Sequence, residues 1–393
     1  MSAARYLETA MQHNHFDCIV IGFGGVGSAA MRYAALNGWK VLGIDRFGPA
    51  HNRGSSHGQT RVIRKSYFEH PNYVPLLQDA YELWDELNKR HRTAPEIKEL
   101  LTQCGVLQIG PADGNVVTGV LKSSQEHGLK VEQFSADDIH KRLPILKVPA
   151  GHVGVFEPEG GFLRVELCVA AMIKQALVAG ATIESGVSID QWSVDDAGVV
   201  HVKSEQGSWS ADRMIVCAGA WTNKILGDVG LPLKLLAKQQ HWYQLDRVEQ
   251  KLVNQFPCFL NELNDGSCFY GTPELDTLGM KVCEHSGGQP IDSPDELAQA
   301  IDLDQQARVE AYLDEHFHFT KKRLVHHSMC MYTMTPSEHF ILDTHPDHSQ
   351  IAYAAGLSGH GFKFAPVLGK RLVDMLSGKQ DARFDFLRAP KPA

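Results

Sequence analysis

The stretch FDCIVIGFGGVG, residues 16–27, decides the fold of this chain. Its apolar first half is typical of a buried parallel strand, and Gly22, Gly24 and Gly27 follow in G-x-G-x-x-G spacing. Such glycines permit a tight turn and close approach to a pyrophosphate, which would face the amides of a helix predicted over residues 28–37. Asp45 ends a second predicted strand, residues 40–44, and can accept a hydrogen bond from a ribose hydroxyl. The pattern favours dinucleotide binding over a glycine turn that merely packs a helix on a sheet.

Length and composition point to an ordinary soluble enzyme-sized protein. The 393 residues suggest about two domains, and 43% hydrophobic with 21% charged residues is typical of globular chains. A net charge of −8 argues against nucleic acid or an anionic membrane as the main partner. No apolar run approaches the ~20 residues that span a bilayer, and residues 1–15 lack a signal-peptide core. We therefore expect a cytoplasmic protein with small-molecule partners.

The eight cysteines are scattered and contain no C-x-x-C pair. Several of them lie in apolar runs that are typical of buried strands. We expect reduced thiols, no zinc site and no bound metal.

The order of predicted elements indicates an α/β (α+β) protein. Helices are predicted near residues 74–87, 115–127, 169–179, 302–316 and 365–376, with buried strands over 214–221 and 351–356. The first of these strands ends in small residues, so that a turn at Gly219 can approach a nucleotide closely. The first and last blocks are α/β in character, whereas the middle has longer alternating strands such as 241–245. This predicts a discontinuous nucleotide domain (15–95, 152–226 and 327–393), a mainly β substrate domain (96–151 and 227–326) and an extension over 1–14.

Four further motifs resemble one known family. They are GSSHGQTRVIR at 54–64, GMKV at 279–282, CMYTMTP at 330–336 and GLSGHGFKF at 356–364. In this order they closely resemble the monomeric sarcosine oxidase and N-methyl-L-tryptophan oxidase family, over nearly the whole chain from Phe16. The strand around WYQ, 242–244, is more similar to the N-methyltryptophan oxidase branch. The resemblance implies a monomer with a glutathione-reductase-like FAD-binding Rossmann domain and a mainly β substrate domain.

The resemblance also implies that FAD is attached covalently. Cys330 matches the cysteine that the family joins by a thioether to the flavin 8α-methyl carbon. Attack requires a thiolate, so we expect a cation or hydrogen-bond donor near Cys330. The alternative is a buried structural cysteine. The full set expected at the cofactor is Gly22, Gly24, Gly27, Asp45, Arg46, Ser55, His57, Arg61, Gly219, Cys330, Gly359, Gly361 and Lys363.

Two cations match the family positions that hold a substrate carboxylate. Arg64 can bind such a group bidentately, and Lys363 follows the Gly359-His360-Gly361 turn. The positive end of a helix starting near residue 364 would stabilise reduced flavin. Without the motifs, an ordinary ion pair would be the simpler interpretation of both cations.

Lys281 matches a lysine that promotes the reaction of reduced flavin with oxygen. A fixed ammonium stabilises superoxide as it forms, although a lysine on a strand is more often solvated. Tyr270 and His285 match positions near the substrate amine. Arg61, in a loop or first helical turn, is expected to face the flavin while Arg64 faces the substrate.

One position departs from the family pattern. The family commonly has two consecutive histidines where this chain has Ser56 and His57. With one imidazole fewer near the flavin, the family's efficiency of flavin attachment and its redox tuning do not carry over to this chain. The reaction class still does.

The sequence therefore predicts an FAD-dependent oxidase of a secondary N-methyl L-amino acid, with the primary amino acid, formaldehyde and hydrogen peroxide as products. One alternative is an oxidase of a cyclic or larger secondary amino acid, such as pipecolate or an N-alkyl-lysine. An alternative of another class is a flavin-binding protein without oxidase activity.

Overall fold

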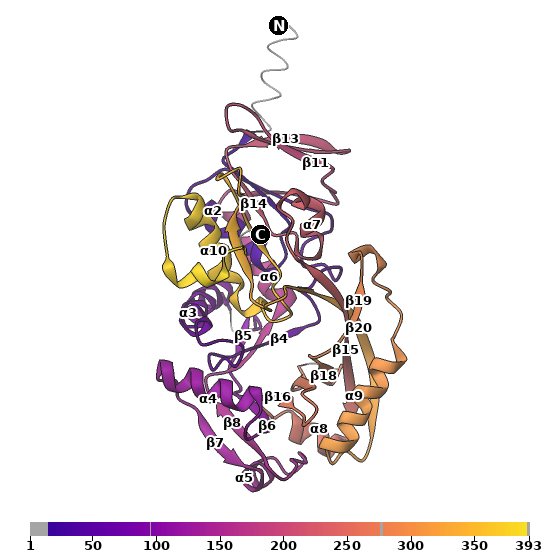
Figure 1. Cartoon of the computed structure of the whole chain (residues 1–393). Coiled ribbons are helices and arrows are strands. Elements are labelled where there is room, and N and C mark those ends of the chain that lie inside the picture. The colour runs from indigo at the N-terminus through magenta and orange to yellow at the C-terminus, as the bar shows by residue number, and fades with distance from the viewer. Residues whose placement is uncertain (1–14, 95, 276–277, 391–393) are drawn as a thin grey trace, which may run out of the picture.

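The computed structural model describes residues 15–94, 96–275 and 278–390. The predicted extension, 1–14, lies outside the described residues. Figure 1 shows an elongated molecule with one β-sheet in the upper part and a second, larger one in the lower part. The long strands β15 (Lys234–Leu245) and β20 (Lys322–Met334) run from the middle of the molecule into its lower part.

The upper sheet has six strands in the order β10-β3-β2-β14-β22-β21. The first five are parallel, and β21 runs antiparallel to β22. The central strands are buried along their whole length because both faces of the sheet are covered. The bounds are β10 Thr182–Ser185, β3 Val41–Asp45, β2 Cys18–Ile21, β14 Met214–Val216, β22 Ile351–Ala355 and β21 Ile341–Thr344.

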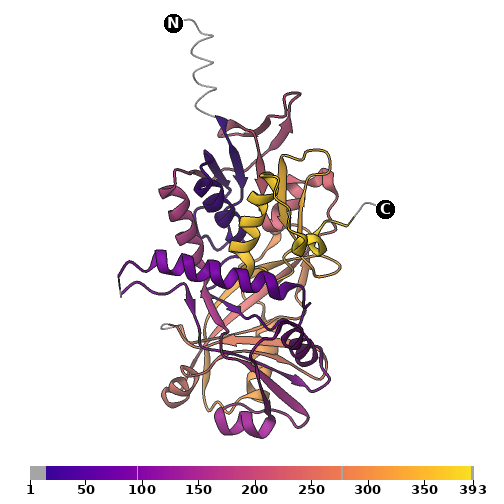
Figure 2. The same cartoon turned by 90° about the vertical axis from the view of Figure 1, so that its left-hand side faces the viewer.

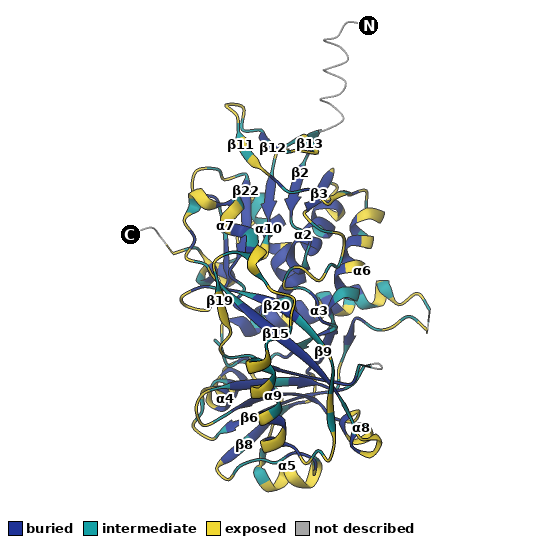
Figure 3. Cartoon of the chain, turned by 90° about the vertical axis from the view of Figure 1, so that its right-hand side faces the viewer, coloured by how far each residue is buried: buried dark blue, intermediate teal, exposed yellow. Residues whose placement is uncertain are grey.

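Helices cover one face of this sheet and a small sheet covers the other. Cys18 and Val20 pack among α2 (Gly25–Leu36), α3 (Tyr73–His91), α6 (Val165–Val178) and α10 (Ala365–Leu376). The alternate residues Ile19 and Ile21 pack on the opposite side with Val200 and Val202. Figure 3 shows the buried strands between these layers. The covering sheet has the order β1 (His15–Phe16), β13 (Gly207–Ala211), β12 (Val200–Ser204) and β11 (Gln191–Val194).

The lower sheet has nine strands in the order β19-β15-β18-β17-β16-β6-β8-β7, and β20 also pairs with β15. α9 (Leu303–His316) covers one face, where Tyr312 stacks on Phe269 with ring centroids 4.1 Å apart. The remaining strands are β19 Gln289–Ile291, β18 Met280–Glu284, β17 Cys268–Thr272, β16 Cys258–Glu262, β6 Val106–Pro111, β8 His152–Glu157 and β7 Glu132–Ser135.

A three-stranded sheet, β4-β9-β5, lies between the two larger sheets, and α3 crosses the same region (Figures 1 and 2). It consists of β4 (Thr60–Ile63), β9 (Gly161–Arg164) and β5 (Leu101–Thr102). The other α-helices are α4 Asn115–His127, α5 Ala136–Arg142, α7 Thr222–Ile225 and α8 Arg247–Val253. Short 3-10 helices lie at Gly219–Trp221, Gly227–Val229, Pro294–Glu296, Phe362–Phe364 and Ala382–Leu387.

Three predicted elements were wrong in detail. The stretch 16–21 is not one strand, because the chain bends at Asp17 and Phe16 pairs with the covering sheet. The predicted strand 214–221 ends at Val216, and its small residues form a 3-10 turn instead. Arg61 lies on the strand β4 rather than in a loop or helical turn. Apolar runs do not mark such breaks, which depend on pairing with distant strands. The predicted domain boundaries stay a prediction.

Candidate active site

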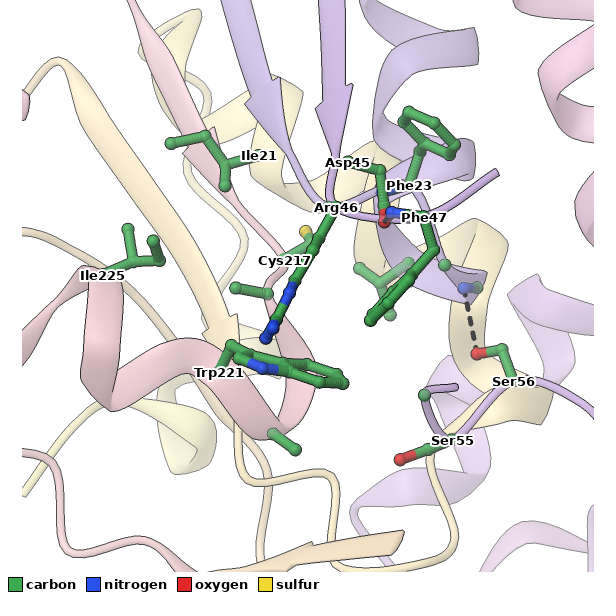
Figure 4. A pocket seen from close by; sticks show the side chains of 18 of the residues that line it. Ile21, Phe23, Asp45, Arg46, Phe47, Ser55, Ser56, Cys217, Trp221 and Ile225 are labelled. Atoms are coloured by element: carbon green, nitrogen blue, oxygen red, sulfur yellow. Dashed lines mark hydrogen bonds between the residues drawn. The ribbon is translucent and has the colours of Figure 1, made fainter. Parts of the chain in front are cut away.

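A pocket opens at the carboxyl ends of β2, β3, β14 and β22 (Figure 4). In open parallel sheets this edge is where nucleotide ligands bind. Most of the lining comes from the glycine turn 22–26, residues 44–56, residues 217–221 and residues 354–358. Six of the residues predicted at the cofactor line this pocket together: Gly22, Gly24, Asp45, Arg46, Ser55 and Gly219.

Two glycines of the turn, Gly22 and Gly27, have no room for a side chain. Gly22 has φ +82°, and a Cβ there would lie 2.5 Å from the carbonyl oxygen of Cys217. A Cβ on Gly27 would lie 1.8 Å from the carbonyl oxygen of Gly22. The turn therefore brings α2 directly against β2, with the first amides of α2 at the pocket. Ser56 Oγ accepts from Gly25 N at 3.1 Å, so the residue that departs from the family pattern contacts this helix terminus (Figure 4).

Asp45 fixes the neighbouring turn as well as lining the pocket. Its two carboxylate oxygens accept from Phe23 N (2.9 Å) and Phe47 N (2.8 Å). Burial raises the pKa of Asp45, although the two hydrogen bonds act to lower it. Arg46 extends over the pocket towards Trp221 and lies 6.0 Å from its ring centroid (Figure 4). Arg46 also pairs with Asp295 at 2.7 Å.

These residues fit a dinucleotide such as FAD. The backbone amides at the start of α2 suit a pyrophosphate, and the Asp45 carboxylate oxygens each keep a second lone pair for a hydroxyl donor. Gly219 and Gly356, with φ of +54° and +57°, form two further turns without side chains along the wall. Apolar walls complete the lining: Ile21, Val187, Ile189, Trp221 and Ile225.

A second group of polar side chains lies on the face of the nine-stranded sheet opposite α9. Successive strand residues point to opposite faces, so those that alternate with the core residues of α9 point away from it. These residues are Lys238, Gln240 and Trp242 on β15, Tyr270 and Thr272 on β17, Lys281 and Cys283 on β18, and Ser328, Cys330 and Tyr332 on β20.

Lys281 is a buried cation held by backbone carbonyls. Its Nζ donates to the carbonyls of Gly58 (2.7 Å) and Thr60 (3.2 Å) and lies 5.1 Å from the ring centroid of Trp242. Burial, together with the positive charge of Arg61, lowers the pKa of Lys281 to about 7. Lys281 is therefore a fixed side chain that titrates near neutral pH, not a solvated surface lysine.

Arg61 is the cation beside Cys330. Its Nη2 lies 3.7 Å from Cys330 Sγ and donates to Ser55 O at 2.8 Å, while Nη1 donates to Thr60 O at 2.8 Å. Cys330 itself is buried. Because Ser55 also lines the pocket, this contact connects the pocket with the polar sheet face.

Tyr270, His285 and Tyr332 form an adjoining cluster. His285 Nδ1 lies 3.2 Å from Tyr332 Oη, and the Tyr270 and His285 rings are 6.3 Å apart. Burial and the neighbouring Lys238 lower the pKa of His285 to about 3, so its imidazole is neutral. Lys238 Nζ donates to the carbonyls of residues 285, 286 and 287 and fixes this loop. Sequence reasoning missed Lys238 and Tyr332, although the register pairs Lys238 directly with Cys330.

Arg64 and Lys363 lie together beside one carboxylate that the sequence did not reveal. Arg64 Nη2 donates to both oxygens of Glu69 at 2.8 and 2.9 Å. Burial acts to raise the pKa of Glu69, but the neighbouring Arg64 lowers it to about 2. Lys363 Nζ donates to the carbonyl of His360 at 2.7 Å, and burial, followed by Arg64, lowers its pKa to about 7. Both cations lie over the ring of Tyr67, at 4.4 and 5.1 Å from its centroid.

Of the remaining predicted residues, two glycines shape the loop before α10 and His57 lies beside β20. A Cβ on Gly359, where φ is +78°, would lie 2.4 Å from the Tyr332 ring, and one on Gly361 would lie 2.6 Å from Leu357 Cβ. His57 is buried, with Nδ1 3.4 Å from Ser328 Oγ, and burial followed by Arg61 lowers its pKa to about 3. In this structure His57 packs against β20 and does not line the pocket.

Neither a metal cluster nor a membrane-spanning helix is present among the described residues. They contain no group of three or more histidine, cysteine or acidic side chains arranged to hold a metal ion. Within residues 15–94, 96–275 and 278–390, no helix is both long and apolar enough to cross a membrane.

Comparisons with known proteins agree over almost the whole chain. Residues 17–375 match the family model described as FAD dependent oxidoreductase (DAO). The chain is 38% identical over 381 residues to N-methyl-L-tryptophan oxidase of Escherichia coli O139:H28, covering 95% of this chain and 98% of that protein. It is 36% identical over 366 residues to monomeric sarcosine oxidase of Bacillus sp. strain NS-129, covering 92% of each.

Solved structures share the fold at lower sequence identity. NikD, an unusual amino acid oxidase, has a TM-score of 0.82 and 22% identity, covering 96% of this chain and 98% of that chain. Glycine oxidase from Geobacillus kaustophilus has a TM-score of 0.80 and 16% identity, covering 97% of this chain and all of that one. The predicted α/β fold is confirmed.

Proposed function

Given that the chain belongs to the FAD dependent oxidoreductase (DAO) family, we propose that it oxidises a secondary N-methyl L-amino acid with oxygen. The products would be the primary amino acid, formaldehyde and hydrogen peroxide. The relatives named N-methyl-L-tryptophan oxidase and monomeric sarcosine oxidase support this substrate class.

The observation that carries the proposal is a pair of buried cations with only one directly bonded carboxylate among the described residues. Glu69 bonds to Arg64, and Lys363 lies over the same Tyr67 ring as Arg64. Glu157, the other buried carboxylate near Arg64, is bonded to the backbone N–H groups of Lys65 and Ser66. Arg64 is 3% exposed and Lys363 is 7% exposed, so water compensates neither charge well. A substrate carboxylate would supply the missing anion, in part by taking over the Arg64 fork from Glu69.

FAD, when bound, supplies the two-electron acceptor. The amides at the start of α2 and the Asp45 carboxylate would hold its nucleotide part, and residues 356–361 would lie beside its ring system. We place covalent attachment at Cys330. The Arg61 guanidinium, 3.7 Å from the sulfur, would stabilise the thiolate that attachment requires.

The bound amine must lose its proton before oxidation. The buried cations repel the positive charge of a protonated substrate amine. The imidazole of His285 is neutral and does not offset this repulsion. Tyr270 and His285 would contact the amine end, with the carboxylate held by Arg64 and Lys363. The polar sheet face therefore orients the N-methyl carbon, and its buried position excludes water.

A peroxide-coupled screen tests the substrate class. The panel contains N-methyl amino acids of different side-chain size, pipecolate, an N-alkyl-lysine and the matching primary amino acids. We expect peroxide and formaldehyde in equal amounts from an N-methyl substrate only. Turnover of pipecolate alone would favour the cyclic-amine alternative, and no substrate-dependent bleaching under anaerobic conditions would favour a flavin-binding protein without oxidase activity.

Acid precipitation tests the covalent attachment of FAD. Acid-precipitated wild type should stay yellow, whereas Cys330→Ala should release FAD or contain none. Complete loss of colour from the wild type would contradict attachment at Cys330.

We also propose a cytoplasmic monomer, which cell fractionation and light scattering would test.

The oxygen step should depend on Lys281 separately from the amine step. The ammonium beside the reaction site would stabilise the negative charge that forms on oxygen. In Lys281→Met, anaerobic flavin reduction should persist while reoxidation slows by orders of magnitude, each tenfold corresponding to ~1.4 kcal/mol of barrier. Stopped-flow mixing with oxygen measures this, and an unchanged reoxidation rate would refute the role.

A further inference from the structure

Two cysteines outside the proposed reaction site have their sulfur atoms in contact. Cys104 Sγ and Cys258 Sγ lie 3.8 Å apart, although the residues are 154 positions apart in the chain. Cys258 is the first residue of β16, which pairs in parallel with β6, and its N–H donates to Gly105 O at 3.0 Å. Gly105, with φ +81°, turns the chain between Cys104 and β6.

The two thiols differ in exposure and acidity. Cys104 is half-buried, whereas Cys258 is fully buried beside Val106 and Phe162. A hydrogen bond from the Cys258 thiol lowers the pKa of Cys104, and burial raises the pKa of Cys258. Reactivity with oxidants follows thiolate character and access, so Cys104 is the thiol that should react first.

We propose that Cys104 and Cys258 are a peroxide-oxidised thiol pair that closes to a disulfide in the folded protein. The Cys104 thiolate attacks one oxygen of hydrogen peroxide, the O–O bond breaks, and hydroxide leaves and takes a proton to become water. Sulfur is oxidised to sulfenic acid. The Cys258 sulfur then attacks the Cys104 sulfur, the S–O bond breaks, and the hydroxyl group leaves as a second water with the Cys258 proton. Two thiols and one peroxide thus give one disulfide and two waters.

The geometry requires only a local movement. A disulfide needs about 2.05 Å between sulfur atoms, against the 3.8 Å observed, and the half-buried Cys104 side chain lies in the short connection between β5 and β6. β5 belongs to the three-stranded sheet and β6 to the nine-stranded sheet. The bond would therefore fix the connection between these two sheets to β16.

The oxidant in this proposal is hydrogen peroxide, which the proposed function also gives as a product of this enzyme. The test adds hydrogen peroxide from outside, so its result does not depend on whether that function is correct. Holoenzyme is treated with a small molar excess of peroxide, quenched with catalase, alkylated, digested without reductant and analysed by mass spectrometry. We expect a linked peptide pair containing Cys104 and Cys258, lighter by two hydrogens than the free pair and separated by dithiothreitol.

Two further measurements identify the order of events. In Cys258→Ser, peroxide should leave a sulfenic acid on Cys104 that dimedone traps, whereas Cys104→Ser should leave Cys258 unmodified. Cys168 is the internal control, because it is buried and its thiol donates to Leu100 O. Peroxide should leave it a free thiol, and it should react with the alkylating reagent only after the protein is unfolded. If Cys104 and Cys258 both remain free thiols after treatment, if Cys104 proceeds to sulfinic acid without the linkage, or if the link forms only in unfolded protein, the proposal is wrong.

Discussion

Arg64 pairs with a buried carboxylate of the protein itself, and the proposed function gives it a ligand carboxylate as well. The family resemblance indicated its role, but its partner Glu69 gave no signal, because residue 69 faces Arg64 only through the conformation of the turn after β4. Sequence patterns report periodic burial and do not report which side chains an irregular turn brings together. The same limit hid Lys238, whose proximity to Cys330 depends on strand register.

Removing the charge of Glu69 should strengthen the binding of a carboxylate ligand. Glu69→Gln frees the Arg64 fork, so a simple carboxylic acid should bind at least about tenfold more tightly, or ~1.4 kcal/mol. The ligand-free variant should also melt at lower temperature, because breaking a buried pair costs about 3–5 kcal/mol. Titration of the flavin absorbance and a thermal scan measure these effects. Glu159→Gln removes the exposed partner of Lys65 and should change neither.

Carboxylate binding should also weaken above neutral pH. The pKa of Lys363 is about 7 in the free site, and a bound anion raises it because the charged form then has a partner. Below pH 7 the ammonium is already present. Above pH 7 each anion must bring a proton, so the affinity should fall by up to about tenfold per pH unit. Lys281 has a similar pKa, and Lys281→Met is the control that should keep this pH dependence. An affinity unchanged between pH 6 and 9 would contradict the assignment to Lys363.

At the scale of elements, the glycine turn and the helices were the most predictable features. The helices predicted over 115–127 and 365–376 have the bounds observed for α4 and α10. Their apolar spacing is a property of each segment alone. In contrast, the bend at Asp17 and the strand character of β4 depend on pairing with β13 and β9, which lie far away in the chain.

The close contact of α2 with the strand turn makes a sharp prediction. In Gly27→Ala the new methyl would lie 1.8 Å from the Gly22 carbonyl oxygen, and backbone cannot move aside as a flexible side chain can. We expect a loss of at least about 1–3 kcal/mol of stability and poor FAD retention. Gly48→Ala, also near the pocket, meets no atom within 4 Å and should behave as wild type. Flavin content per purified protein and Tm distinguish the two variants.

At the scale of the whole molecule, the buried cations should make stability depend on pH. Burial lowers the pKa of Lys281 and of Lys363 to about 7, against about 10.4 in an unfolded chain. Between these values the unfolded state binds more protons, so the free energy of unfolding rises with pH, by at most about 1.4 kcal/mol per unit for each lysine. The Tm of ligand-free holoenzyme should therefore rise from pH 7.0 to 8.3 relative to that of Lys281→Met. Parallel pH profiles of the two proteins would show that Lys281 is not the source.

The carbonyl contacts of Lys281 also determine when the reaction site can exist during synthesis. Its partners at residues 58 and 60 are more than 220 positions away, and Cys330 lies 275 positions after Ser55. At about 5–20 residues per second, Cys330 leaves the ribosome roughly 14 to 55 s after Ser55 does. Throughout that interval the β4 segment is without the strands that later cover it. The proposed attachment of FAD at Cys330 would therefore follow the synthesis of β20, and translation, not only the bond-forming chemistry, would set its earliest time.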